Sequence, residues 1–293
     1  MFQIFANIFG YLLGFLYNLI NNYGLAIILF TVIIKLVLLP LSIKQQKSMK
    51  KNAELQDKMK SIQFKYKNDQ EKMNQEIMKM YKEENMSPFS GCLTAIIQMI
   101  LLLSIFYLVR SPLTFMQKVP TENLNTYKTQ LQEEGKEVNN VYSEINLIRE
   151  YNLLKEKNPE DSNVDKLDLK MNFFGLDLSK IPQQNMSDFT VYIIPVLYII
   201  SSFISIKITT SMQSKKNENK EKVIIDGKTG EEEKEEANET DTMMQTNKMM
   251  NWMIPIMSIS IAFVAPLGLA LYWLINNILM ILERLIIDKV VKD

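Results

Sequence analysis

The sequence predicts an all-α polytopic membrane protein with five transmembrane helices, an amino-terminal interfacial helix and a cytoplasmic antiparallel helical hairpin. The main observation is the grouping of apolar residues. Runs without Asp, Glu, Lys or Arg cover residues 1–30, 91–109, 189–206 and 254–282, and about 20 apolar residues cross a bilayer core as a helix. The segments between these runs are strongly charged, so a formal net charge of +0 does not indicate a soluble globule.

The first segment, residues 1–22, is apolar but interrupted by four asparagines, with recurring tyrosine and phenylalanine. It can span the bilayer or lie in its interface, and the aromatic residues favour an interfacial helix on the outer face. It has neither a basic leader nor a small-residue cleavage site, so we do not expect a removable signal peptide. Span 1 follows at residues 23–41, where Pro40 ends the apolar run and lysines follow at once.

The charged segment at residues 42–87 contains eleven lysines and seven acidic residues. Its apolar residues recur at spacings of three, four and seven, which is typical of one apolar stripe on each of two helices. We therefore predict the cytoplasmic helical hairpin here, with its turn at residues 66–69.

The remaining elements follow from the alternation of apolar and charged stretches. Span 2 is predicted at residues 91–109, and residues 110–187 form an extracytoplasmic loop insertion with an amphipathic piece at 141–157. Asp188 is a suitable N-cap for the third span. The later elements are span 3 at 188–206, a disordered acidic cytoplasmic linker at 207–248, span 4 at 249–265, span 5 at 267–284 and a cytoplasmic tail at 285–293.

Lysine and arginine near the span ends predict the orientation. They are concentrated in the 42–87 hairpin and directly after span 3. The hairpin, the acidic linker and the carboxyl end are therefore expected in the cytoplasm, and the amino end and the 110–187 loop outside a bacterial plasma membrane. Spans 4 and 5 are short, because two helices of about 16 residues reach only about 24 Å each.

Composition excludes several classes of function. The chain has no histidine and a single cysteine, Cys92, which removes Ser-His-Asp and Cys-His catalysis and cysteine-based metal clusters. A balanced charge argues against direct recognition of nucleic-acid sequence, and no phosphate-binding GxxxxGK[ST] motif is present. We therefore expect no enzyme, no catalytic residue, no metal and no cofactor.

Lys35 is the only charged residue well inside a predicted span. A lysine at the centre of a bilayer costs roughly 2.5 to 3.5 kcal/mol, so such residues usually face a wet cavity or a partner. One alternative is that its long side chain reaches the cytoplasmic interface. The other, which we favour because Thr31 lies one turn away on the same face, is a water-filled groove open to the cytoplasm.

Other predicted spans also carry polar side chains. They form a shared polar cavity with Lys35, or they join helices through hydrogen bonds that are typically worth about 0.6 kcal/mol each. The 19 methionines leave a similar choice between ordinary packing and surfaces that fit many apolar partners. The polar residues are Gln98, Ser104, Ser201, Ser202, Ser205, Tyr272, Trp273, Asn276 and Asn277.

Five segments resemble, in order, the bacterial YidC insertases, and together they cover about two thirds of the chain. They are YGLAIILFTVIIKLVLLP from Tyr23, the lysine-rich hairpin from Lys44 to Glu83, GCLTAIIQM from Gly91, FFGLDLS from Phe173 and PLGLALYWLINN from Pro266. The resemblance implies a membrane protein insertase and folding chaperone whose groove is closed to the outside and open to cytoplasm and lipid.

The same resemblance implies roles for particular residues. The cationic groove residue is Lys35, and the other groove residues are Thr31, Gln98, Ser205, Trp273 and Asn276. Contacts with the ribosome or a targeting factor fall on Lys50, Lys51, Lys58 and Lys65. The implied partners are nascent membrane proteins, the ribosome, the Sec translocon and lipid.

The chain departs from the family's usual pattern in several places. Lys35 stands where arginine is usual and Ile100 where proline is usual, and lysine lacks the planar guanidinium fork. The 110–187 loop and the acidic linker are longer than usual, and the tail after Arg284 is short. Two other functions share most of these features: a translocon-associated scaffold without insertion activity, and a small anion transporter, although internal repeats typical of transporters are not evident.

Overall fold

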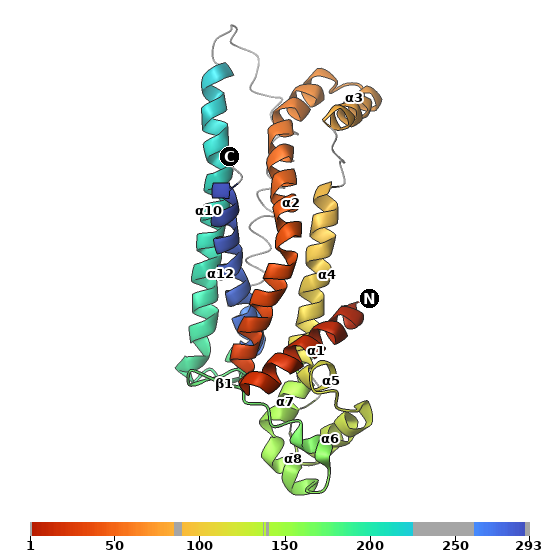
Figure 1. Cartoon of the computed structure of the whole chain (residues 1–293), viewed down its shortest axis with the longest axis vertical. Helices are drawn as coiled ribbons and strands as arrows, with labels where there is room; N and C mark the ends of the chain where they lie inside the picture. The colour runs from red at the N-terminus through yellow and green to blue at the C-terminus, as the bar shows by residue number, and fades with distance from the viewer. Residues whose placement is uncertain (1, 85–89, 137, 139–140, 225–260, 291–293) are drawn as a thin grey trace. The chain divides into compact units, whose positions relative to one another are not determined.

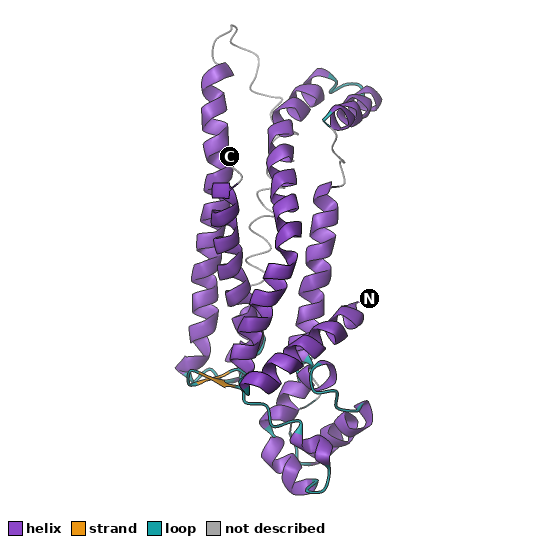
Figure 2. Cartoon of the chain, in the orientation of Figure 1, coloured by secondary structure: helices purple, strands orange, loops and turns teal. Residues whose placement is uncertain are grey.

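The computed structural model of the chain describes residues 2–84, 90–136, 138, 141–224 and 261–290. The described chain is mainly helical (Figures 1 and 2), which confirms the predicted all-α class of membrane protein. The long helices are α1 Phe2–Ile20, α2 Tyr23–Lys65, α3 Gln70–Glu83, α4 Ser90–Arg110, α10 Ile193–Ile224 and α12 Leu267–Val290.

Short elements occupy the segment between α4 and α10. They are α5 Pro112–Phe115, α6 Thr121–Glu133, α7 Ser143–Arg149, α8 Tyr151–Lys157, α9 Ser162–Asp165, the strands β1 Asn172–Phe173 and β2 Leu176–Asp177, and the 3-10 helices η1 Pro182–Gln184 and η2 Phe189–Tyr192. The strands pair antiparallel, with Asn172 opposite Asp177 and Phe173 opposite Leu176. The predicted cap is present, because the Asp188 carboxylate accepts a hydrogen bond from the Thr190 amide at the start of η2.

Four helical segments in the described part of the chain are long and apolar enough to cross a membrane: Phe2–Ile20, Tyr23–Ser48, Phe189–Ile208 and Leu267–Ile287. Met99–Arg110 is apolar but shorter, and it lies within the helix at the predicted second span. Most of the predicted fourth span, and of the acidic linker, lies outside the described residues. Which segments span a bilayer stays a prediction.

Helix α1 has two different faces. Ile4, Ile8, Tyr11, Phe15 and Leu19 are exposed, whereas Ala6, Gly10, Leu13, Leu16 and Tyr17 are buried. In Figure 1 α1 runs obliquely to the first part of α2. The apolar exposed face suits lipid, and it is compatible both with a span and with an interfacial helix.

Helix α2 continues through Pro40, the residue at which the apolar run of the predicted first span ends. Proline in a helix removes one backbone donor and crowds one carbonyl, and this can kink a helix without ending it. Pro40 is exposed, and the residues after it are mostly good helix formers. The predicted first span and the first hairpin helix are therefore one continuous element.

Helix α10 also extends beyond its predicted span. The helix reaches Ile224, so the prediction of disorder was wrong for residues 207–224. Charged and polar residues such as lysine, glutamine and glutamate have good helix propensity, and a preceding apolar helix provides the nucleus from which such a segment can extend.

The chain divides into two compact units. The first contains Met1–Val37, Gln98–Ser202 and Met257–Leu282, and the second contains Leu38–Ile97, Phe203–Ile256 and Glu283–Asp293. In the second unit, α3 follows a turn at residues 66–69, where the sequence predicts it, and Asp69 caps α3 by accepting from the Lys72 amide.

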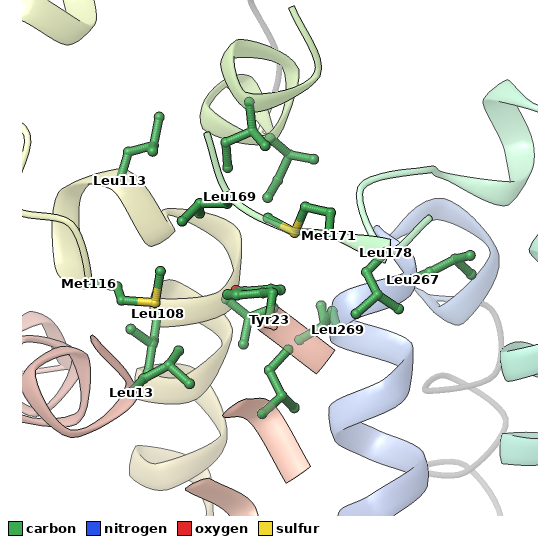
Figure 3. Packing of buried hydrophobic residues seen from close by; sticks show 14 of the residues in the cluster. Leu13, Tyr23, Leu108, Leu113, Met116, Leu169, Met171, Leu178, Leu267 and Leu269 are labelled. Carbon is green, nitrogen blue, oxygen red and sulfur yellow. The ribbon is translucent and has the colours of Figure 1, made fainter. Parts of the chain in front are cut away.

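The core of the first unit joins the 111–187 segment to the membrane helices. Figure 3 shows Leu13 of α1, Tyr23 of α2 and Leu108 of α4 near Leu169 and Met171, with Leu178, Leu267 and Leu269 close by. All of these side chains are almost fully buried. The 111–187 segment is thus a folded part of this unit, where the sequence indicated only a polar loop with one amphipathic piece.

Two glycines allow very close packing in this core. A Cβ atom on Gly10 of α1 would lie 1.9 Å from the carbonyl oxygen of Phe115, and one on Gly24 of α2 would lie 2.5 Å from the ring of Phe173. Neither position accepts a larger residue unless backbone or ring moves. Glycine at these two positions therefore lets α1 approach α5, and α2 approach β1, more closely than a residue with a Cβ atom would permit.

Candidate functional site

Lys35 and Thr31 lie one turn apart on α2, as the helical periodicity predicts. Lys35 is partly buried and Thr31 is almost fully buried. The Thr31 hydroxyl donates to the carbonyl oxygen of Ile27 at 2.6 Å. The hydroxyl of Thr31 therefore already has a partner within its own helix.

A second polar group joins α10 and α12. The side-chain amide of Asn277 donates to the hydroxyl oxygens of Ser201 and Ser202, each at 3.1 Å. The Ser201 hydroxyl in turn donates to the carbonyl oxygen of Tyr198 at 2.8 Å. All three polar side chains are buried. For these residues, the structure shows helix-to-helix hydrogen bonding, one of the two alternatives that the sequence left open.

Trp273 lies on α12 about one turn before Asn277. Its ring is partly buried and packs beside Tyr198 of α10, with 6.0 Å between the ring centroids. Asn276 is also partly buried. Trp273 thus contacts α10 through an aromatic ring, and Asn277, one turn further along α12, contacts α10 through hydrogen bonds.

Two predicted groove residues are not brought to this contact by the structure. Gln98 lies on α4, and its side chain is outside the described residues. Ser205 is buried on α10, but it belongs to the second compact unit. Their place in a groove therefore stays a prediction from the sequence.

The predicted partner-binding lysines differ in their surroundings. The Lys58 ammonium lies 2.6 Å from the Glu84 carboxylate, which lowers the pKa of Glu84 and raises that of Lys58. Lys51 lies 4.0 Å from the same carboxylate, and Lys65 lies over the Tyr66 ring. The side chain of Lys50 is outside the described residues. Lys58 and Lys51 therefore join the two hairpin helices, a role that the sequence analysis did not assign to them.

The sequence analysis also missed the contacts that hold the 111–187 segment. The buried Glu144 carboxylate accepts from the Thr114 amide at 3.0 Å and from the Thr114 hydroxyl at 2.6 Å. Burial raises the pKa of Glu144, and these hydrogen bonds oppose the rise. In the sequence, Glu144 is one polar residue in an amphipathic stretch, and nothing near it identifies Thr114, 30 residues earlier, as its partner.

In the part of the chain that the structure describes, no group of three or more His, Cys, Asp or Glu side chains is placed to hold a metal ion. The polar side chains that the structure brings together at α10 and α12 are one amide and two hydroxyls. Groups of this kind can bind water or peptide polar groups, and they offer no conventional nucleophile–base pair.

The fold and these polar contacts define the chain as a multi-pass α-helical membrane protein. It belongs to the 60Kd inner membrane protein family, whose sequence pattern matches residues 15–293. The resemblance to the YidC insertases is therefore confirmed at the level of the family.

Several curated relatives are named membrane protein insertase YidC. The protein from Chlorobaculum parvum is 31% identical over 274 residues, which cover 94% of this chain and 34% of that protein. The protein from Clostridium perfringens is 43% identical over 118 residues, which cover 40% of this chain and 49% of that protein. The chain spans about a third of the length of the relatives that it matches along most of its own sequence.

Proposed function

We propose that this chain is a membrane protein insertase and folding chaperone. The observation that carries the proposal is the family match along residues 15–293, together with relatives named for this activity. In the proposed mechanism, short polar segments of a client cross the membrane through a hydrophilic groove open to the cytoplasm, and the apolar helices of the client pass into lipid.

The groove is proposed around Lys35, with Thr31, Gln98, Ser205, Trp273 and Asn276 as lining residues. Lys35 lies twelve residues after Tyr23, the first residue of α2, or about 18 Å along the helix axis. This depth is near the middle of a hydrocarbon core of about 30 Å. A cation at that depth supports a wet recess, because a dry one would be costly.

The driving force needs no nucleotide. A client's polar tail loses hydrogen bonds to water in hydrocarbon, and a wet, cationic groove shortens that dry path. Burial of the client's apolar segment in lipid then supplies roughly 25 cal/mol per Å². We therefore propose a protein that performs no enzymatic reaction and uses no cofactor.

The proposed orientation places the amino end and the 110–187 segment outside, and the hairpin and the carboxyl end in the cytoplasm. The proposed partners are nascent membrane proteins and lipid, with the ribosome or a targeting factor and the Sec translocon as further contacts. Lys58 and Lys65 both have exposed side chains, but Lys58 pairs with Glu84, so we propose Lys65 as the main hairpin contact with the ribosome or a targeting factor.

The test is insertion by the full chain reconstituted into liposomes, with a small client synthesised in their presence. Replacing Lys35 by Gln removes the charge from the proposed groove, whereas Lys44→Gln removes an exposed charge nine residues further along the same helix. We expect Lys35→Gln to reduce insertion of a client with an acidic amino tail, and Lys44→Gln to leave it unchanged. Lys35→Arg should retain activity, because it keeps the charge.

The same assay separates the alternatives. A scaffold without insertion activity predicts that liposomes containing the chain insert no more client than empty liposomes. An anion transporter predicts uptake of small anions that depends on Lys35, with no effect on clients. Equal insertion by the wild type and Lys35→Gln with clients of every tail charge would refute the proposed role of Lys35.

A further inference from the structure

The turn between β1 and β2 has an unusual residue at its tip. Phe174 has φ of 49° and Gly175 has φ of 81°, so two successive residues lie in the left-handed region. Such hairpin turns normally use Asn or Gly, and a bulky side chain with positive φ is a conformational outlier. Phe174 is nevertheless 87% exposed. Apart from the ring of Phe173, packing among the described residues therefore does not explain an aromatic side chain at this position.

The neighbouring residues hold this turn firmly in place. Phe173 packs against Gly24 of α2, and its ring lies 4.7 Å from that of Phe174 in an edge-to-face arrangement. The side-chain oxygen of Asn172 accepts from the Gly175 amide at 3.1 Å, and the backbone carbonyl oxygen of Asn172 accepts from the Asn22 side-chain amide at 2.8 Å. Phe173 is thus directed inward and Phe174 outward by a fixed backbone.

Backbone hydrogen bonds set the level of the turn relative to the membrane helices. The Tyr23 amide at the start of α2 donates to the carbonyl oxygen of Lys170 at 3.0 Å. At the start of α12, the Leu267 and Gly268 amides donate to the carbonyl oxygens of Lys180 and Leu178, each at 2.9 Å. The strands are therefore attached to the first residues of two segments apolar enough to span. The ends of such segments lie at the boundary between hydrocarbon and water.

A second exposed aromatic residue lies beside this turn. β2 packs beside η2, where Phe189 is 84% exposed, and Met186 shortly before it is 67% exposed. η2 leads directly into α10, and Phe189 is the first residue of the candidate span Phe189–Ile208. Further exposed apolar side chains follow on one face of this span. These side chains are Ile193, Val196, Leu197 and Ile200.

We propose that Phe174, Met186 and Phe189 form a lipid-binding surface that inserts into the interfacial layer of the bilayer at this end of the helices. The occupant is lipid because Phe189 begins a segment that is apolar enough to span a membrane, and because backbone hydrogen bonds hold the two strands at the first residues of α2 and α12. Aromatic residues are enriched at this depth, where a ring contacts both acyl chains and headgroups. The proposal does not depend on insertase activity.

The test measures the depth of single labels in proteoliposomes of the full chain, in a Cys92→Ala background. A nitroxide is attached to Phe174→Cys, to Phe189→Cys and, as the matched control, to Asn125→Cys on the exposed face of α6 in the same unit. Accessibility to oxygen, which concentrates in lipid, is compared with accessibility to a water-soluble nickel complex. We expect labels at 174 and 189 to favour oxygen over nickel, and the label at 125 to show the reverse.

A second variant tests the turn without a label at its tip. Phe174→Asn suits the left-handed backbone, so the protein should unfold at an unchanged or higher temperature while the label at 189 moves toward water. Labels at 174 and 189 that are as accessible to nickel as the label at 125 would overturn the proposal. Labels protected from both reagents would also overturn it, because they would indicate that protein covers the surface.

Discussion

The contact between α1 and α5 gives a prediction whose size follows from the structure. A Cβ atom on Gly10 would lie 1.9 Å from the Phe115 carbonyl oxygen, and one on Gly14 would lie 3.2 Å from the Met116 carbonyl oxygen. The first distance is more than 1 Å too short, and its neighbour is backbone, which cannot rotate away. The second requires a movement of only a few tenths of an ångström.

Gly10→Ala and Gly14→Ala therefore form a matched pair. Each replacement gains the same helix propensity, about 0.8–1.0 kcal/mol, so this gain cancels in the comparison. Overpacking in a close-packed core typically costs about 1–3 kcal/mol. We expect Gly10→Ala to be less stable than Gly14→Ala by about 1–3 kcal/mol, with Gly14→Ala close to the wild type.

Thermal unfolding in detergent, followed by circular dichroism, measures the difference between the two variants. Limited proteolysis provides a local readout, because separation of α1 from α5 should expose the 111–187 segment to cleavage in Gly10→Ala first. If Gly10→Ala unfolds at the same temperature as Gly14→Ala or above it, the close packing of α1 on α5 is incorrect.

Three further predictions concern polar contacts. Asn277→Ala should lower stability by about 1 kcal/mol, because it removes two interhelical hydrogen bonds of about 0.6 kcal/mol each. A double-mutant cycle with Ser202→Ala should show coupling between the two residues, and additive effects would contradict the contact. The pKa of Glu144 is raised in the folded protein, so the folded state favours the neutral carboxyl group. This preference contributes fully to the free energy of unfolding below pH 4.5, the ordinary pKa of glutamate, and the contribution is lost as the pH rises through the raised pKa. Thermal unfolding at a series of pH values should show this slope in the wild type, and Glu144→Gln should abolish it. Lys58→Gln should raise the pKa of Glu84 toward 4.5, measured by NMR titration; an unchanged pKa would show that the pair does not form in solution.

Periodicity and composition predicted those parts of the fold that depend on local sequence. The apolar runs gave the class of protein, the spacing of apolar residues gave the turn before Asp69, and a capping residue type gave the role of Asp188. Each of these signals lies within a few residues of its effect. Hydrophobic period, capping and turn chemistry act at that range, so one sequence is enough to detect them.

The folding of the 111–187 segment was not predictable in the same way. Its packing depends on pairs far apart in sequence, such as the Tyr17 hydroxyl, which accepts from the Lys170 amide at 2.9 Å, and Gly10 against Phe115. Polar composition alone made this segment look like a loop. The glycines gave a weak signal, since Gly10 and Gly14 repeat at a spacing of four, but that spacing does not identify the partner.

The candidate site was predicted in part. Sequence reasoning correctly named the polar residues of α10 and α12 as possible hydrogen-bonding partners, but it could not assign Asn277 to Ser201 and Ser202, because the rotation of each helix about its axis is set by tertiary packing. It likewise treated Lys58 as a residue for a partner, although Glu84 of the same hairpin is close enough to pair with it.

The attachment of the 111–187 segment constrains where the first unit can move. The amides of Tyr23, Leu267 and Gly268 belong to the first turns of α2 and α12, which leave donors without partners in the helix, and carbonyl oxygens of the 170–180 stretch accept from them. Separating the helices at this end would exchange these backbone hydrogen bonds for bonds to interfacial water, at a net cost of about 0.5–1.5 kcal/mol per bond. The side-chain bonds of Asn277, ten residues or about 15 Å further along α12, are individually weaker. A rearrangement at the depth of Asn277 therefore breaks weaker bonds than a movement that separates α12 from the 170–180 stretch.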